Sequence, residues 1–587
     1  MRARQAKQPG LSRPQTRYWV SVASITHPGS TSGVLLFASY ERYAPVPEMQ
    51  ISDPMKELDG ASATPQPSRT SKPRLGARVS RTRFWRQAMQ SNHLRSSSST
   101  LKVLLYLLLL TVAAVAVHGY HSGVEDAEVY NPGILKILHP QFFPFGAEFF
   151  QVEAKLMWYP NLMAAFAQAF HLSLEATLFF WHVVSIFLLL LACWILAGVC
   201  FTEERARWAA VALVAALLTT PVAGTALYIR DEYLSPRSLT LFAGVFSIAA
   251  AMKRKYLGVI AWTLFSILIH PLMFIYGLSL IAVIIVLRDF HGLRRPATAT
   301  MVAAGLLPMG VSFRYPSEAY RAVIQMRPYF FLLRWHWYEW MGIFGPLALL
   351  WWFGRLARRH GMNQLDLLCQ ALILYEAVYF GLAMVMTVPP RLIVLAHYQP
   401  MRNLQLVYLL LFMIMGGLLG KWALRDHAWR WLALFVPLCA VMFYVQCQRY
   451  PASPHIEWPG AAPQNDWLRA FAWIRENTPS DAVFVLNPYH MILPGEDEHG
   501  FRALAQRSML ADAVKDSAPA AMFPDVPLAE HWEQQIKAQA GWEHFQAADF
   551  ERLHREWGVT WTVLDKPGAT AFTCPYANRI LRVCKLN

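Results

Sequence analysis

Long apolar blocks are the feature that most constrains this chain. A helix needs about 20 apolar residues to span the hydrocarbon core of a bilayer, and only helices and closed barrels can satisfy their backbone groups there. The blocks predict a polytopic α-helical membrane protein with about 11 spans, several of them short or paired. These spans are expected near 102–118, 178–200, 208–228, 237–252, 256–270, 271–287, 297–312, 341–353, 364–386, 401–420 and 430–446.

Composition agrees with this class of protein. Of the 587 residues, 55% are hydrophobic and only 16% are charged, whereas soluble domains carry about 25% charged residues. The net charge of +15 is concentrated, because residues 1–100 hold 15 Lys and Arg against 5 Asp and Glu, while the tail from Pro451 holds 12 against 17. No zinc-ligand spacing and no phosphate-binding glycine loop is present in the sequence. We therefore expect no nucleic-acid partner.

Three parts follow from the composition along the chain. Residues 1–100 are rich in Ser, Pro, Thr and Arg, which predicts a disordered basic tail. The tail is either regulatory or lies upstream of a true start at Met89, where a short basic head precedes an apolar helix as in an uncleaved signal anchor; we favour the second explanation. Residues 101–446 form the transmembrane part, with a long first outer loop at 119–177, and 447–587 form a small domain.

Basic loops predict the orientation in the membrane. Lys and Arg in short loops stay on the cytoplasmic side, and with a cytoplasmic N-terminus the 11 predicted spans place every basic loop on that side. These loops are 202–208, 253–255, 288–295, 354–361 and 421–430. The first long loop and the C-terminal domain are then extracytoplasmic.

The C-terminal part alternates helix and strand patterns, which indicates a small α/β domain of about 120 residues. An amphipathic helix at 466–477 precedes a buried strand, and a later helix turns at Gly558 into a strand at 559–564. Cys574 and Cys584 lie ten residues apart near the end. If this domain is outside the cytoplasm, a disulfide and two free thiols are both open alternatives.

Clustered acids open the first outer loop, in the stretch "HSGVEDAEVY". Glu125, Asp126 and Glu128 lie within four positions, directly after the first apolar helix. A carboxylate at the membrane surface can remove a proton from an acceptor hydroxyl as a general base. The alternative is a set of solvated acids that favour a helix N-terminus. A divalent cation bound by these oxygens is possible, but we predict no cofactor.

Other outer loops carry polar groups at a comparable depth, in "YIRDEYLSPRS", "IHPLM" and "YQPMRNL". Arginine matches phosphate oxygens in a fork, so these loops could bind the phosphate of a lipid-linked sugar. Each group also has a simpler explanation, such as an ion pair at a helix end, a polar group at a helix break or a snorkelling arginine. We predict Asp231 as a second catalytic acid beside Asp126 and Glu128, and as substrate-binding residues Glu125, Glu232, Arg237, His270, Gln399 and Arg402.

The layout resembles the GT-C superfamily of integral-membrane glycosyltransferases, which have a first helix, an acidic first outer loop and many further spans. "VEDAEVY" is similar to the first-loop acidic motif of that superfamily, and the resemblance implies that Asp126 is the catalytic base. "DEYLSPRS", "YQPMRNL" and "WIRENTPSDAVFV" are similar to bacterial GT-C-like proteins of unassigned activity. The resemblance covers roughly residues 100–500, and no WWDYG-type signature of the oligosaccharyltransferases is present.

The resemblance implies a glycosyltransferase of the bacterial inner membrane and cell envelope. It would move a sugar from a polyprenyl-phosphate donor to an acceptor on the outer face. Two other classes stay open: a transporter or flippase, and a non-catalytic assembly or sensor protein. The charges gather at the outer ends of the spans and no inverted repeat is visible, which favours the enzyme. The sequence leaves the sugar, the acceptor and any protein partner open.

Overall fold

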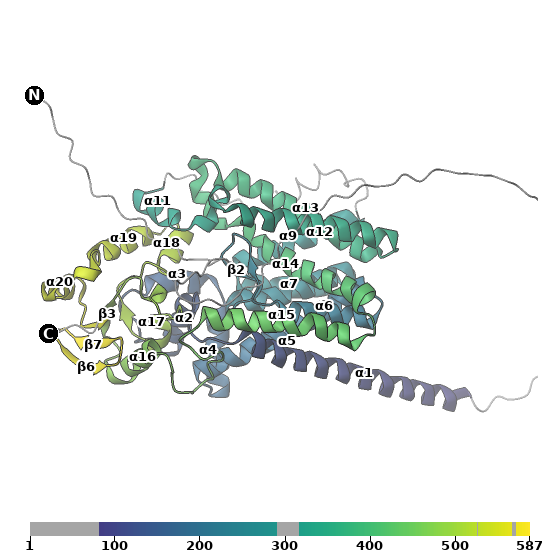
Figure 1. Ribbon diagram of the computed structural model, residues 1–587, viewed down its shortest axis with the longest axis horizontal. Helices are drawn as coiled ribbons and strands as arrows, with labels where there is room; N and C mark the ends of the chain where they lie inside the picture. The colour runs from purple at the N-terminus through teal and green to yellow at the C-terminus, as the bar shows by residue number, and fades with distance from the viewer. Residues whose placement is uncertain (1–80, 290–315, 525, 566–570, 587) are drawn as a thin grey trace, which may run out of the picture. The chain divides into compact units, whose positions relative to one another are not determined.

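The computed structural model describes residues 81–289, 316–524, 526–565 and 571–586 (Figure 1). Most of the predicted basic tail and the predicted span at 297–312 lie outside these residues.

Ten helices correspond to the apolar blocks within the described part of the chain. Six helical segments are long and apolar enough to cross a membrane: Thr100–His118, Leu174–Cys200, Pro271–Asp289, Asn363–Thr387, Pro390–Leu424 and Ala428–Arg449. The chain is therefore a membrane protein. The helices are α1 (Arg81–His118), α5 (Leu174–Cys200), α6 (Glu204–Ala216), α7 (Pro236–Met252), α8 (Tyr256–Ile269), α9 (Pro271–Asp289), α12 (Trp337–Arg359), α13 (Asn363–Thr387), α14 (Leu404–Leu419) and α15 (Ala428–Arg449).

The predicted continuous span at 208–228 is wrong. Helix α6 ends at Ala216, and a two-stranded hairpin follows, formed by β1 (Pro221–Val222) and β2 (Leu227–Tyr228). Proline lacks the amide hydrogen that a helix interior uses, and Gly224 has a positive φ of 65° with Trp335 packed against it. The hairpin nevertheless returns the chain to the same end of the bundle as the exit of α1.

The predicted break between the paired spans at 256–287 is confirmed. Helix α8 ends at Ile269 and α9 begins at Pro271, with His270 between them in an extended conformation. The His270 amide donates to the Ser266 carbonyl at 2.9 Å. The residue before a proline is disfavoured in the helical region, so this break is encoded locally.

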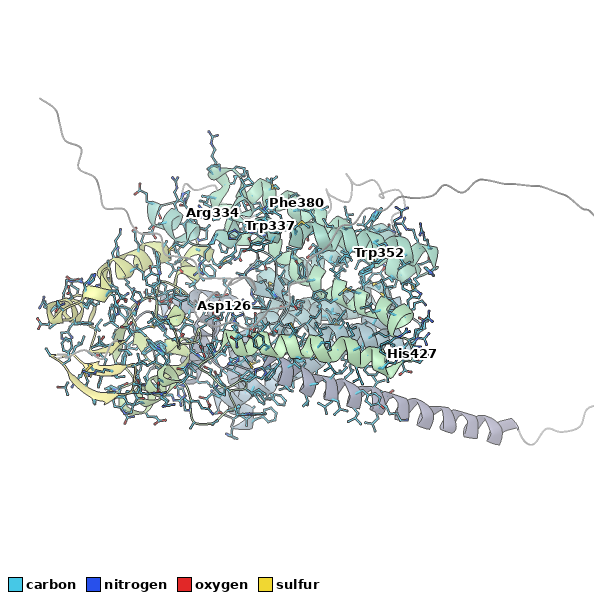
Figure 2. The ribbon with its side chains drawn as sticks, viewed as in Figure 1. Asp126, Arg334, Trp337, Trp352, Phe380 and His427 are labelled. Atoms are coloured by element: carbon cyan, nitrogen blue, oxygen red, sulfur yellow. A yellow bond between two sulfur atoms is a disulfide. The ribbon has the colours of Figure 1, made fainter. Side chains whose placement is uncertain are left out.

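The first long loop folds into three helices: α2 (Ala127–Leu138), α3 (Glu148–Leu156) and α4 (Tyr159–Phe170). Trp158 and Phe170, at the two ends of α4, are 54% and 62% exposed. Trp337 and Trp352 on α12 are also more than half exposed (Figure 2). Exposed aromatic rings of this kind suit the region where a membrane meets water.

The C-terminal part contains a five-stranded sheet in the order β4-β3-β5-β7-β6. The predicted helix at 466–477 and the predicted strands near 483 and 561 are present, and Gly558 ends its helix with a φ of 68°. The elements are α16 (Asp466–Asn477), β3 (Val483–Leu486), α17 (Phe501–Ala505), β4 (Ser508–Met509), α18 (Ser517–Met522), α19 (Leu528–Ala538), α20 (Ala547–Trp557), β5 (Trp561–Leu564), β6 (Thr573–Ala577) and β7 (Arg582–Lys585).

The acids of the first loop and the C-terminal sheet lie at the same end of the helices, as the sequence predicted. Arg449, at the end of α15, contacts Glu125, whereas His427 precedes the start of α15 (Figure 2). Two of the predicted cytoplasmic loops, 202–208 and 421–430, meet at the other end, where Arg205 pairs with Asp426 at 2.6 Å.

Cys574 in β6 and Cys584 in β7 form a disulfide, which decides between the two alternatives left open by the sequence. We expect mass spectrometry of protein purified without reductant to find the two cysteine-containing peptides linked, and to find them separate after reduction. Because such bonds persist in oxidising compartments, the linked peptides would support an extracytoplasmic domain. Two free thiols in unreduced protein would contradict the bond.

Candidate functional site

Asp126 is held between two cations that come from distant parts of the chain. Its Oδ2 accepts from Arg237 at 2.7 Å, and its Oδ1 accepts from the Lys515 amine at 3.0 Å. Burial acts to raise the pKa of Asp126, but Lys515 and Arg237 outweigh it and hold the pKa well below its usual range. Asp126 is therefore a carboxylate at any physiological pH, and a weak proton acceptor while both ion pairs persist.

Arg237, at the start of α7, has its donors committed to other side chains. Its Nε and one terminal nitrogen donate to Asp231, and the other terminal nitrogen donates to Asp126. The hydroxyl groups of Tyr130 and Tyr233 accept further bonds at 3.3 and 3.0 Å. Since a guanidinium has five N–H donors, little of Arg237 is left for a substrate. Its predicted role in binding substrate stays untested.

Asp231 and Glu232 are both buried, at 5% and 2% exposure. Asp231 accepts from Ser235 at 2.7 Å as well as from Arg237, so it orients that arginine. Burial raises the pKa of Glu232 well above its usual range, and the nearest cation, Arg449, lies 3.7 Å away. The geometry favours a supporting role for both acids, and their predicted roles in chemistry stay untested.

Glu125 joins the acid cluster to the C-terminal domain. Its backbone has a φ of 55°, and its amide donates to the Glu498 carbonyl at 2.9 Å. Its carboxylate pairs with Lys515 and, at 3.0 Å, with Arg449. Burial acts to raise the pKa of Glu125, but Lys515 and Arg449 lower it. Lys515 therefore pairs with two adjacent acids, Glu125 and Asp126.

Glu128, the third acid of the first loop, is fully buried at 1% exposure. Its two carboxyl oxygens accept from the backbone amides of Arg502 and Ala503, each at 2.9 Å, at the beginning of α17. Burial raises the pKa of Glu128 to about 8, although Arg502 acts to lower it. Glu128 thus joins the first loop to the C-terminal domain. Its predicted role in catalysis is untested, and this geometry gives it a structural one.

Arg402 lies near these acids, and its guanidinium is not paired with any of them. It lies in the short helical segment η5 (Pro400–Asn403), which is held in place because the Tyr276 hydroxyl donates to the carbonyls of Tyr398 and Gln399, both at 2.9 Å. Half-buried Arg402 has no side-chain hydrogen bond or ion pair among the described residues, and its Nε is buried without a partner.

Arg402 lines a narrow groove between α7, α8, α9 and α14 whose accessible interior is about 20 Å³. The groove reaches from Thr240 to Ser247 on α7, which is roughly 10 Å along a helix axis. Its walls are mostly apolar, with Arg402 and Gln405 at the end where the acids lie. Gln405 is held by the carbonyls of Tyr228 and Ile229. The groove therefore combines a mostly apolar lining with one guanidinium at its end.

His270 and Gln399, which the sequence predicted to bind substrate, lie in different surroundings. His270 is buried at the break between α8 and α9, within electrostatic reach of Arg237, Arg402 and Asp126. Gln399 is 5% exposed and its side-chain amide donates to the Met522 sulfur at 2.8 Å, so it contacts the C-terminal domain instead of the groove.

The sequence reasoning missed Glu153 in α3 and Lys515. Glu153 is half-buried, and the charges nearest to it are those of Asp126, Arg237 and Arg402. Burial raises the pKa of Glu153 to about 7, and the negative charge of Asp126 adds to that effect. Its position on one face of an amphipathic helix gave no distinguishing signal. Lys515 lies 389 residues from Asp126, so no local pattern could reveal the contact.

Within the described ranges, no group of three or more His, Cys, Asp or Glu side chains is arranged to hold a metal ion. The acids of the first loop are instead neutralised by Arg237, Arg449 and Lys515.

A family model described as "Domain of unknown function (DUF6798)" matches residues 465–523, from α16 to α18, a stretch that includes Arg502 and Lys515. No curated protein matches the chain. Among solved structures, it is similar to the archaeal oligosaccharyltransferase AglB from Archaeoglobus fulgidus, in complex with an inhibitory peptide and a dolichol-phosphate. The identity is 14% and the TM-score 0.37, over 79% of this chain and 69% of that chain. A likeness this weak carries no argument about this chain.

Proposed function

We propose that this protein is a membrane glycosyltransferase that moves a sugar from a lipid-phosphate donor to an acceptor hydroxyl. The reaction takes place at the end of the bundle covered by the C-terminal domain, which we assign to the outer face of a bacterial inner membrane. The observation that carries the proposal is the open guanidinium of Arg402 at the end of a mostly apolar groove, beside a set of carboxylates.

The groove matches the two chemical parts of such a donor. Its apolar walls on α7, α8 and α9 suit contact with the part of a polyprenyl chain next to the phosphate. A guanidinium binds phosphate oxygens through two parallel hydrogen bonds. Arg402 has donors free for this purpose, whereas Arg237 has its donors committed to protein groups.

The carboxylates supply the other half of the chemistry. During transfer the acceptor hydroxyl must lose a proton while the donor phosphate leaves with a negative charge. Arg402 would neutralise the leaving phosphate, and an acid beside it would take the proton. Asp126 and Arg237 form the fixed polar wall of this space, so Asp126 contributes its charge to the site.

Arg402 substitutions test the donor site. We expect Arg402→Ala to weaken binding of decaprenyl phosphate in detergent by about ten- to a hundredfold, because a hydrogen-bonded charge pair is worth about 1.5–3 kcal/mol. Arg402→Lys keeps the positive charge but loses the paired donors of the guanidinium. Its affinity for decaprenyl phosphate should therefore lie between those of wild type and Arg402→Ala. Binding can be followed by microscale thermophoresis of the purified full chain.

Arg359→Ala is the matched control, because Arg359 is exposed in the last turn of α12 and has no contact with the groove. Equal affinity in wild type, Arg402→Lys and Arg402→Ala would make Arg402 an interfacial anchor only. Wild-type protein that binds the lipid phosphate but transfers no sugar from any polyprenyl-phosphate donor tested would favour a transporter or sensor.

A further inference from the structure

Two opposite charges near Asp126 have no partner in the described part of the chain. Glu153 on α3 and Arg402 in η5 make no side-chain hydrogen bond and no ion pair, either with each other or with another described residue. Most other charged groups of this region are paired: Asp126 and Asp231 with Arg237, and Glu125 with Arg449. A site that keeps two charges apart and unpaired is arranged to receive a ligand with complementary groups.

Glu153 lies within electrostatic reach of Arg402. Its helix α3 packs on α2, where Ala154, the residue after Glu153, lies against Gly133. Tyr130 on α2 lies within electrostatic reach of Glu153, Arg237, Asp126 and Arg402, and the same three charged residues surround Glu153. The Tyr130 hydroxyl also accepts from Arg237 at 3.3 Å, which joins α2 of the first loop to the start of α7. A lipid phosphate held by Arg402 would place its sugar among these groups.

Asp126 is poorly suited to take a proton in this setting. Both of its carboxyl oxygens already accept from cations, one from Arg237 and one from Lys515. A proton arriving on Asp126 would have to displace one of these ion pairs. Glu153 has no ion pair to break, and it is only half-buried, so an acceptor hydroxyl can reach its oxygens.

We propose that Glu153 is the catalytic base, with Asp126 acting as a positioning residue that holds Arg237. This inference rests on the proposed glycosyl transfer. The acceptor O–H bond breaks and its proton moves to the Glu153 carboxylate. The acceptor oxygen forms a bond to the anomeric carbon of the sugar, and the bond from that carbon to the phosphate oxygen breaks. The electron pair leaves with the phosphate, whose charge Arg402 neutralises.

The pH dependence of the reaction separates the two carboxylates. The charged and titratable groups that face Glu153 are Asp126, Tyr130, Arg237 and Arg402. Burial and Asp126 raise the pKa of Glu153 to about 7, and a base works only when it is deprotonated. The transfer rate should therefore rise as the pH passes through about 7 and then level off. A reaction that used Asp126 as base would show no such rise, because its pKa is far lower.

The test compares Glu153→Gln with wild type in full-length protein in nanodiscs, using polyprenyl phosphate that carries radiolabelled glucose or mannose as the donor. We expect Glu153→Gln to lower kcat by about 10²–10⁴-fold and to abolish the rise near pH 7, with unchanged binding of decaprenyl phosphate. Glu153→Asp keeps an acid at the position and should retain an intermediate rate. Glu148→Gln, in the first turn of the same helix, is the matched control and should behave as wild type.

The outcomes distinguish this inference from the function on which it rests. If wild type transfers sugar and Glu153→Gln keeps both its rate and its pH profile, Glu153 is not the base, and the proposed function stands. If wild type binds no lipid phosphate and transfers no sugar, the proposed function is wrong and the role of Glu153 falls with it. Loss of lipid-phosphate binding or of thermal stability in Glu153→Gln alone would show a structural role and would also overturn the inference.

Discussion

Asp126→Asn should lower the rate of sugar transfer by about 10²-fold, the loss that follows when a catalytic arrangement is displaced by about 1 Å. The amide keeps the shape of the side chain but removes the charge that pairs with Arg237 and Lys515. Arg237 would then retain Asp231 alone as an anionic partner. The measurement is kcat and KM for a labelled polyprenyl-phosphate donor, with the pH profile recorded for each variant.

The pH profile carries the second half of this prediction. If Asp126 positions Arg237 and Glu153 takes the proton, the rise in rate near pH 7 should persist in Asp126→Asn at a lower overall rate. Asp481→Asn, an exposed position before β3, provides the control for loss of an aspartate charge. Transfer by Asp126→Asn at the wild-type rate would show that Asp126 has no part in the reaction.

Glu128→Ala should destabilise the junction between the first loop and the C-terminal domain by roughly 2–5 kcal/mol. The substitution leaves the buried amides of Arg502 and Ala503 without their acceptors. It also leaves Arg502 with Asp516 as its remaining acidic partner. We expect a lower midpoint of thermal denaturation in detergent and faster proteolysis between α15 and α16.

Gly500→Ala tests the same junction through a residue of the C-terminal domain. A Cβ at Gly500 would clash with a Glu128 carboxyl oxygen, so the backbone or Glu128 must shift. Gly345→Ala is the matched control, because a Cβ there meets no atom within 4 Å. Wild-type stability in both Glu128→Ala and Gly500→Ala would contradict a structural role for this contact.

The contact of Glu128 with the amides of Arg502 and Ala503 should also make the free energy of unfolding depend on pH. Burial raises the pKa of Glu128 to about 8 in the folded protein, above its ordinary value of about 4.3. The folded state then binds a proton that the unfolded chain has lost, so the contribution of Glu128 is greatest below about pH 4 and is lost as the pH rises towards 8. The decline in stability between about pH 4 and pH 8 that comes from Glu128 should be absent in the Glu128→Gln variant.

The sequence by itself determined the features that depend on neighbouring residues. Apolar blocks of sufficient length gave the membrane class and most of the helix positions, because hydropathy is a local property. The break at His270 followed from the proline after it, and the end of α20 followed from Gly558. The helix at 466–477 was visible because its apolar residues recur with the helical period.

Local patterns failed where contacts across the chain decided the conformation. The block at 208–228 is apolar enough for a span, yet the chain forms a hairpin there, and Trp335 from another part of the chain packs against Gly224. The strands β4 and β6 were also missed. β4 has only two residues and β6 contains Pro575, and each is an edge strand that pairs with one neighbour in the sheet.

The candidate site shows the same division. Its acids could be found from the sequence because they follow a membrane helix in one short stretch. What each acid does depends on partners far away: Lys515 for Asp126, and the amides of Arg502 and Ala503 for Glu128. Glu153 is set apart by the lack of any such partner. Burial and ion pairing set the strength of an acid, and only the tertiary structure brings together the residues that bury and pair it.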